Sequence, residues 1–186
     1  MRQTRLIGAG HRWTQRLSRP PGGPKTDPNP TDRGKSGAKR HIVVERKGIP
    51  LAIAQSAANV HDSKMLEETI DMVQPIRTPR GQYRKRPTKL HADKGYDYAR
   101  CRKALRTRGI IARIARRGIE SSERLSRYRW VAERTLSWLS RYRRLKVRCE
   151  RRDDIHQAFL HLGCILICWN FLRQGFCFVR CSKRAS

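Results

Sequence analysis

After residue 40, segments with apolar residues at every second position take turns with segments whose apolar residues recur at helical, 3.6-residue spacing. This order of strand-like and helix-like segments limits the fold classes that the chain can adopt. Strands are expected at 41–45, 49–55, 88–93 and 110–115. Helices are expected from Asp62 and over 97–108, 126–148 and 154–172. The Lys47-Gly48 pair between the first two strands predicts a β-hairpin. The resulting order of strands and helices indicates a mixed α/β layer fold.

The first 38 residues differ from the rest of the chain. They hold five of the nine prolines and show no apolar period, so we expect an irregular, basic, Pro/Gly-rich segment there. The folded domain is then expected over residues 39–176. A basic tail is expected at 177–186.

Positive charge dominates the sequence of 186 residues, with 43 Lys and Arg against 15 Asp and Glu and a net charge of +28. Thirty-two of the basic residues are Arg, whose planar fork suits phosphate, so nucleic acid is the expected partner. Nineteen basic residues and only four acids lie between Arg100 and Arg152. A generic basic protein, such as a ribosomal or nucleoid protein, has the same composition.

The longest apolar stretch, residues 158–172, is shorter than the roughly 20 residues of a membrane span and contains His161 and Asn170. We therefore expect a buried core helix and no membrane contact. The six cysteines lack the C-x-x-C spacing of zinc sites, and no export signal precedes them, so they are expected as small apolar thiols. These features predict a cytoplasmic protein.

Asp93 follows a predicted strand and precedes a glycine turn in the segment LHADKGYD. Ligand chemistry in open α/β sheets gathers at the carboxyl ends of strands, so Asp93 is a candidate catalytic residue. A turn former or helix cap is the alternative. His91, two residues earlier, should share its strand face and is expected as a buried polar partner rather than a metal ligand.

Glu133 lies on a predicted helix and points away from its apolar stripe. The stripe consists of Val131, Thr135, Trp138, Tyr142 and Leu145. Glu133 shares the other face with Arg129 and Ser140. It is therefore either a functional acid or half of an ordinary surface pair with Arg129.

Six sequence blocks occur in the order that is typical of bacterial insertion-sequence transposases of the DDE class. The blocks are PNPTDRGKSG, AKRHIVVERKGIPLAIAQSAANVHDSKML, LHADKGYD, IARRG, RYRWVAERTLSWLSRYRRL and RRDDIHQAF. The chain resembles this family from about Pro28 to Phe176.

The resemblance implies a ribonuclease-H-like mixed sheet flanked by helices, in which three acids hold two Mg²⁺ or Mn²⁺ ions that act on phosphodiester bonds. Asp93 matches the second acid and Glu133 the third, as catalytic residues and metal ligands. Arg129 matches the arginine that contacts DNA phosphate in a Tyr-Arg-Glu-Lys arrangement. Ser126 and Ser140 stand where its Tyr and Lys belong, and Tyr128 and Arg141 lie nearby.

Further residues are expected around this site. Phosphate contacts are expected from Lys35, Lys39, Arg40, Arg134 and Arg141. Turn and cap roles, or support of the site, are expected for Asn59, His61 and Asp62. Trp130 either stacks at a distorted DNA end or belongs to the core, as helix-face tryptophans more often do.

The family's first acid belongs on a strand upstream of PNPTDRGKSG, where this chain reads HRWTQRLSRP at 11–20. Asp27 and Asp32 lie in the Pro/Gly-rich segment and do not match it. Because Trp13-Thr14 forces an Asp triplet in a shifted reading frame, we interpret the start of the chain as the first strand read out of frame, through decay or programmed frameshifting. The sheet is then expected to lack an intact first strand, and the chain to neither nick nor join DNA by itself.

The function expected from the resemblance is DNA transposition. Its partners would be the inverted-repeat ends of the element and target DNA, and a homodimer is expected in the synaptic complex. A non-catalytic DNA-binding transposase remnant and an unrelated RNA-binding protein are the alternatives.

Overall fold

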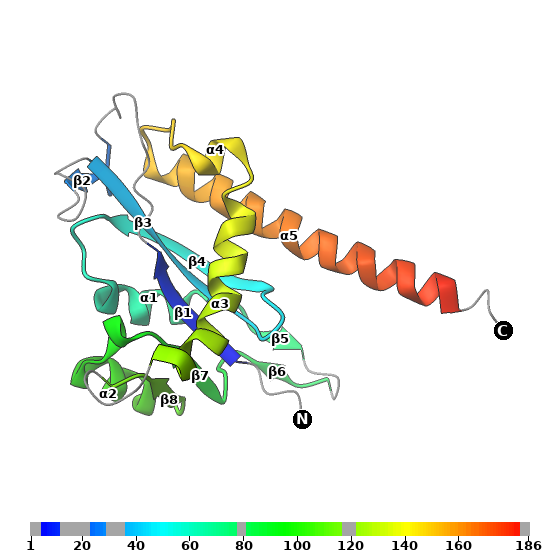
Figure 1. Ribbon diagram of the computed structural model, residues 1–186, viewed down its shortest axis with the longest axis horizontal. Helices are drawn as coiled ribbons and strands as arrows, with labels where there is room; N and C mark the ends of the chain where they lie inside the picture. Colours follow the sequence, from blue (N-terminus) through cyan, green and yellow to red (C-terminus); the bar gives the residue numbers. More distant parts are fainter. Residues whose placement is uncertain (1–4, 12–22, 29–35, 78–80, 117–121, 183–186) are drawn as a thin grey trace.

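One mixed β-sheet forms the centre of the computed structural model, which describes residues 5–11, 23–28, 36–77, 81–116 and 122–182 (Figure 1). Its six strands are β1 (Arg5–His11), β2 (Asp27–Pro28), β3 (Ser36–Val44), β4 (Pro50–Ala57), β7 (Lys89–Ala92) and β8 (Ile111–Ile114). A separate two-stranded ribbon consists of β5 (Ile76–Arg77) and β6 (Tyr83–Arg84). The helices are η1 (Asp62–Met65), α1 (Leu66–Asp71), η2 (Lys94–Tyr96), α2 (Ala99–Thr107), α3 (Ser122–Leu139), α4 (Arg143–Lys146) and α5 (Asp153–Ser182).

The strand order across the sheet is β4-β3-β1-β7-β8, and β2 pairs with the first residues of β3. The first three strands of the order are antiparallel neighbours, whereas β7 is parallel to both β1 and β8. The β3–β4 hairpin forms where the sequence predicts it, and Gly48 takes the positive φ of +88° that its turn requires. The chain therefore has an α/β, ribonuclease-H-like fold, as the family resemblance implies.

Helices cover both faces of the sheet, and each face has its own apolar core. On one face Val43, Leu90 and Ala92 pack with side chains of α1 and α2. On the other face Ile42, Val44 and Ile53 pack with side chains of α3, α4 and α5. We call the second face the α3 face. Neighbouring residues of β3 therefore alternate between the two cores, as a central strand requires.

The first strand of the sheet is present, so the expectation that it is missing is wrong. β1 lies between β3 and β7, with Ile7 paired to Val44 and Gly8 paired to Ala92. The first 38 residues are accordingly not wholly irregular. Glycine has a low intrinsic strand propensity, so the conformation of the segment RLIGAGH depends on the two strands that flank it. None of its seven residues is an acid.

Two further expectations fail near the end of the chain. The predicted helix over 126–148 is divided, because α3 ends at Leu139 and the short α4 follows after a turn. The last helix continues to Ser182, past residue 172 where it was expected to end, and so includes residues 177–182 of the segment expected as a basic tail. Figure 1 shows α5 extending beyond the sheet.

The described part of α5 is only half buried, which corrects the expectation of a core helix. Leu160 and Ile167 are buried, whereas Ile165 and Trp169 are about 60% exposed, at 61% and 62%. Within the described residues, Asp153–Arg173 is long and apolar enough to cross a membrane by length and composition, with a mean hydropathy of 1.5. The described cysteines, Cys101, Cys149, Cys164 and Cys168, are all free thiols.

Candidate functional site

Asp93 continues β7 at its carboxyl end. Its backbone is extended, with φ −72° and ψ 167°, and its Oδ1 accepts a hydrogen bond of 2.7 Å from the Lys94 backbone N–H. Asp93 thereby caps η2, which was the structural alternative considered for it. Capping through one oxygen does not prevent the carboxylate from having a second role.

The sheet register shows which residue of β1 lies level with Asp93. Gly8 pairs with Ala92, so the next residue, Ala9, is level with Asp93 on the neighbouring parallel strand. Ala9 is also the antiparallel partner of Ile42, which belongs to the α3 face. Since Leu90 and Ala92 face the opposite core, the alternation of β7 directs Asp93 to the α3 face as well. Residue 9 is thus where an acid on β1 would lie beside Asp93, and it is alanine.

Glu133 lies on α3, the helix that covers this face, and is half-buried. The residues that follow it fix this part of α3 to the β3–β4 turn. Arg134 donates from Nη2 to the Lys47 carbonyl oxygen at 2.7 Å, and Thr135 donates from Oγ1 to the Gly48 carbonyl oxygen at 2.8 Å. The structure therefore places both predicted catalytic acids on the α3 face, one on the sheet and one on the helix.

A metal site implied by the family can be tested against these residues. Hard divalent cations take oxygen ligands, and holding two of them requires several carboxylates in one place. Among the residues that the structure describes, no three His, Cys, Asp or Glu side chains lie together as a metal-binding group. With alanine at position 9, the described residues do not fit a two-metal site.

Asp62 lies close to the turn that follows Asp93. A Cβ on Gly95 would lie 4.0 Å from Asp62 Oδ2. The pKa of the Tyr96 hydroxyl is raised strongly, first by burial and then by the charges of Asp62 and Asp93. Sequence analysis treated Asp62 only as a cap or support, and no spacing rule could show that it lies beside Asp93.

Lys39 pairs with Asp62, with 3.2 Å between Lys39 Nζ and Asp62 Oδ1, and Lys39 also donates to the Val60 carbonyl oxygen at 2.7 Å. On the same strand, burial lowers the pKa of His41 to about 4, and its Nε2 lies 2.8 Å from Ser56 Oγ. Lys39 is buried and bound to Asp62 and Val60, so it has no exposed phosphate-binding surface.

The predicted DNA-binding cations have different settings. Lys39 and Arg40 are buried residues of β3 rather than loop cations, because their side chains meet acceptors inside the protein. Arg40 donates from Nη2 to the Leu145 carbonyl oxygen, and burial lowers its pKa to about 10. Lys35 lies outside the described residues, as does the side chain of Arg129.

Arg134 and Arg141 differ in what surrounds them. The guanidinium of Arg134 lies 4.4 Å from the ring centre of Trp130 and 4.8 Å from that of Trp138, in addition to its bond to the β3–β4 turn. Arg141 is exposed in the turn after α3. Trp130 is 48% exposed, so it is not a core residue as helix-face tryptophans more often are.

The remaining predicted residues support the turns. His61, not Asp62, caps η1, since its Nδ1 accepts from the Ser63 backbone N–H at 3.2 Å. Its ring also packs edge-on against Tyr98 at 5.2 Å. Asn59 is exposed in the turn before it, and His91 is half-buried on β7.

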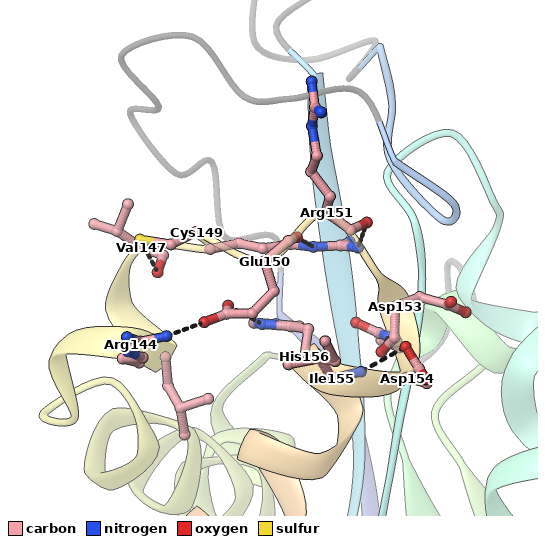
Figure 2. Close-up of polar contacts among 12 residues, drawn as sticks. Arg144, Val147, Cys149, Glu150, Arg151, Asp153, Asp154, Ile155 and His156 are labelled. Carbon is pink, nitrogen blue, oxygen red and sulfur yellow. Dashed lines mark hydrogen bonds and ion pairs between the residues drawn. The ribbon is translucent and has the colours of Figure 1, made fainter.

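Sequence analysis missed a buried polar cluster at the beginning of α5. Figure 2 shows Arg144 and His156 directed at the Glu150 carboxylate, with Arg144 Nη1 at 2.9 Å and His156 Nδ1 at 3.5 Å. Arg148 is buried beside them and donates to four oxygens. These are the carbonyl oxygens of Glu150, Pro24 and Arg151 and the hydroxyl of Thr26, at 3.1, 3.2, 3.4 and 3.1 Å. Of these partners only Pro24 and Thr26 are distant in sequence from Arg148, and contacts of that kind leave no local signal.

The mixed sheet, with β7 parallel to both β1 and β8 and helices on both faces, has the α/β architecture that the sequence resemblance to DDE transposases implied. The chain belongs to the family described as "Transposase DDE domain", which it matches over residues 13–171. A curated relative, the "Putative transposase for insertion sequence element IS402" of Burkholderia cepacia, is 54% identical over 171 residues, covering 92% of this chain and 77% of that protein. The function of the chain is thus DNA transposition, and its family implies the use of divalent metal and binding to DNA.

A solved structure, the catalytic core domain of BIV integrase, is similar to this chain with a TM-score of 0.47 and 15% identity. The similarity covers 88% of this chain and 82% of that one. Members of the transposase family are normally soluble proteins that act on DNA. One apolar helix does not make this chain a membrane protein.

Proposed function

We propose that this chain takes part in transposition by holding DNA, and that it does not cut or join DNA by itself. The observation that carries the proposal is the register at residue 9. Ala9, paired with Ile42 and level with Asp93, occupies the point on β1 where a further carboxylate would face Asp93 and α3. The sheet and helix that carry Asp93 and Glu133 are present, but β1 supplies no third acid at residue 9.

The proposed catalytic residues are Asp93 and Glu133, with Mg²⁺ or Mn²⁺ as the implied ion. An aspartate and a glutamate from different elements supply too few oxygens to hold two such ions. A metal bound by two carboxylates alone would keep most of its water and dissociate readily. We derive no chemical step through it for the chain as it stands.

The proposed partners are the inverted-repeat ends of the element and target DNA, held by two copies of the chain in a cytoplasmic synaptic complex. Arg129 and Arg141 are the proposed phosphate contacts on the α3 side, and Lys35 is proposed in the segment before β3. The excess of basic residues between Arg100 and Arg152 supports binding to the phosphate backbone, which does not require cleavage. A DNA-holding chain could compete with intact transposase at the ends.

Restoring an acid at position 9 tests the proposal. We expect the Ala9→Asp variant to bind Mn²⁺ at least ~10-fold more tightly than the parent chain, measured by isothermal titration or by the loss of free Mn²⁺ signal in EPR. Ala9→Asn is the matched control, because it has the same size and no charge. The parent chain is expected to bind terminal-repeat DNA without nicking a supercoiled plasmid that carries the repeats.

Two outcomes would contradict the proposal. One is Mg²⁺-dependent nicking or strand transfer by the parent chain that disappears in Asp93→Asn. The other is equal Mn²⁺ affinity in Ala9→Asp and Ala9→Asn, which would show that residue 9 does not face Asp93.

A further inference from the structure

Helix α5 has two apolar faces, and the described residues of the chain cover only one of them. The covered face includes Leu160, Gly163 and Ile167, which are buried against α3 and α4. At Gly163 the approach is so close that a Cβ would lie 2.7 Å from Leu145 Cδ1 and 2.9 Å from Leu139 Cδ2. The side of α5 that faces α3 and α4 is therefore closely packed.

The uncovered face carries a regular repeat. Its residues are Ile155, Ala158, Leu162, Ile165, Trp169 and Leu172, all exposed, with spacings that alternate between three and four. We call this set the α5 seam. A 3-4 alternation is the a/d pattern of a coiled coil, which keeps a straight apolar line facing another helix. The covered face has the same spacing, as helices that pack on their own domain do, so the seam is a second helix-packing face on the side that the described body does not cover.

Charge also favours a partner helix at the α5 seam. From residue 155 to residue 172 α5 contains no Lys, Arg, Asp or Glu, in a chain of net charge +28. Two copies of so basic a protein repel one another over most of their surface, and the α5 seam is where they can approach. The helix begins with Asp153 and Asp154 and has Arg173 beyond the α5 seam. An antiparallel pair therefore brings opposite charges together at both ends.

We propose that the α5 seam pairs with the α5 seam of a second copy in an antiparallel coiled coil. Antiparallel pairing about the midpoint of the α5 seam sets Leu162 opposite Ile165 of the second copy and Ile155 opposite its Leu172. It also sets Trp169, the largest residue of the α5 seam, opposite Ala158, the smallest. Large residues facing small ones is the complementarity that well-packed layers need.

The α5 seam offers an area at the lower end of what a specific pair needs. Five large side chains, each roughly half exposed, offer on the order of 500 Å² per copy, or about 1,000 Å² for both copies. This total reaches the lower limit of specific interfaces. The same spacing continues in the sequence to Phe176 and Val179.

Sedimentation equilibrium of the full chain in high salt tests the pairing. The parent chain is expected to be dimeric at micromolar concentration, and Ile165→Glu, which adds two charges beside the twofold axis, is expected to weaken the dimer at least ~100-fold. Asn170→Glu adds the same charge at an exposed position of α5 outside the α5 seam and is expected to leave the dimer intact. Far-UV circular dichroism should show the same helix content in both variants, since both sites are exposed.

A charge exchange tests the orientation. Arg173→Asp is expected to weaken the dimer several-fold, and the further change Asp154→Arg should restore it, because the two residues lie at the same level only in an antiparallel pair. Trp169 fluorescence should shift to shorter wavelength as the chain dimerises. A monomeric parent chain at tens of micromolar would overturn the proposal. Insertion of the monomer into phosphatidylcholine vesicles through the same residues would overturn it as well.

Discussion

Glu150 and Asp93 are both acids at the margin of one sheet, yet their surroundings differ in kind. The Glu150 carboxylate is buried and meets Arg144 and His156, and its neighbour Arg148 reaches back to Pro24 and Thr26. The Asp93 carboxylate is half-buried and caps the turn that follows it directly. The first setting joins segments far apart in the chain. The second presents an acid at a sheet end.

Buried polar groups such as Arg148 and capping acids such as Asp93 should affect different properties of the protein. Groups that connect distant segments contribute to the free energy of unfolding, because losing one leaves its buried partners without hydrogen bonds. A cap such as Asp93 keeps an accepting oxygen when the acid is changed to asparagine, so that change should affect stability less. Substitutions in the two regions should therefore separate stability from chemistry.

Removing the Arg148 side chain should have the largest effect. Arg148→Ala removes the buried donor that serves four acceptors, one in a buried hydrogen bond and three in part-buried ones, and we expect a loss of about 3 kcal/mol in the free energy of unfolding. Denaturant melts at neutral pH measure it. Arg152→Ala is the matched control, since Arg152 is fully exposed and, within the described part of the chain, its guanidinium is hydrogen-bonded to the exposed Asp154. Equal midpoints for the two variants would show that the Glu150 cluster does not stabilise the fold.

Acid should weaken the protein through its buried histidines. Burial is the main cause that lowers the pKa of both His156 and His41 to about 4. For His156 the charges of Arg40 and Arg148 lower the pKa further, whereas Glu150 raises it. Below about pH 6.5 the histidines are protonated in the unfolded chain but stay neutral in the native protein. The free energy of unfolding therefore falls as the pH drops toward 4. The lowered pKa of Glu150 acts in the same direction at still lower pH.

We expect a loss of about 2 kcal/mol per histidine between pH 7 and pH 5, measured by denaturant melts. His41→Gln and His156→Gln should each flatten this dependence. His161→Gln, at an exposed position of α5, should leave it unchanged. A parent chain equally stable at both pH values would contradict the burial of neutral histidines.

The smallest effect separates the two acids directly. Asp93→Asn keeps an oxygen that can cap η2, and we expect a loss of no more than about 0.5 kcal/mol. Glu150→Gln, the same chemical change, should cost about 2 kcal/mol, because the buried Glu150 side chain then loses the charge that pairs with Arg144 and accepts from His156. Chemical denaturation of the two variants side by side provides the measurement. A larger loss for Asp93→Asn would reverse the comparison.

The parts of the fold that could be predicted from sequence are those with strong local patterns. The HIVVE run, the Lys47-Gly48 turn and the strand before Asp93 all form where expected. β1 could not be predicted from its own residues, because RLIGAGH is a strand only through its neighbours β3 and β7. The apolar residues of α5 were taken for core, since apolarity alone does not distinguish a buried face from one that awaits a partner.

For the candidate site, sequence identified the two acids but not their surroundings. Lys39 and Arg40 were expected as loop cations, whereas β3 extends back to Ser36 and carries both side chains into the protein. The approach of Asp62 to the Asp93 turn depends on η1 crossing near the end of the sheet, which no local pattern encodes.

The central position of β1 has a consequence for how the chain folds. β1 joins two halves, β2, β3 and β4 on one side and β7 and β8 on the other, but it is synthesised before either half. Residue 89, where β7 begins, follows residue 11 by about 80 residues, a delay of roughly 4 to 16 s at ribosomal rates. During that interval at least one edge of β1 has no partner strand, and an unpaired edge can pair with the wrong strand. Completion of the sheet is then a late event that closes a long loop, and a slow step in folding is expected at that point.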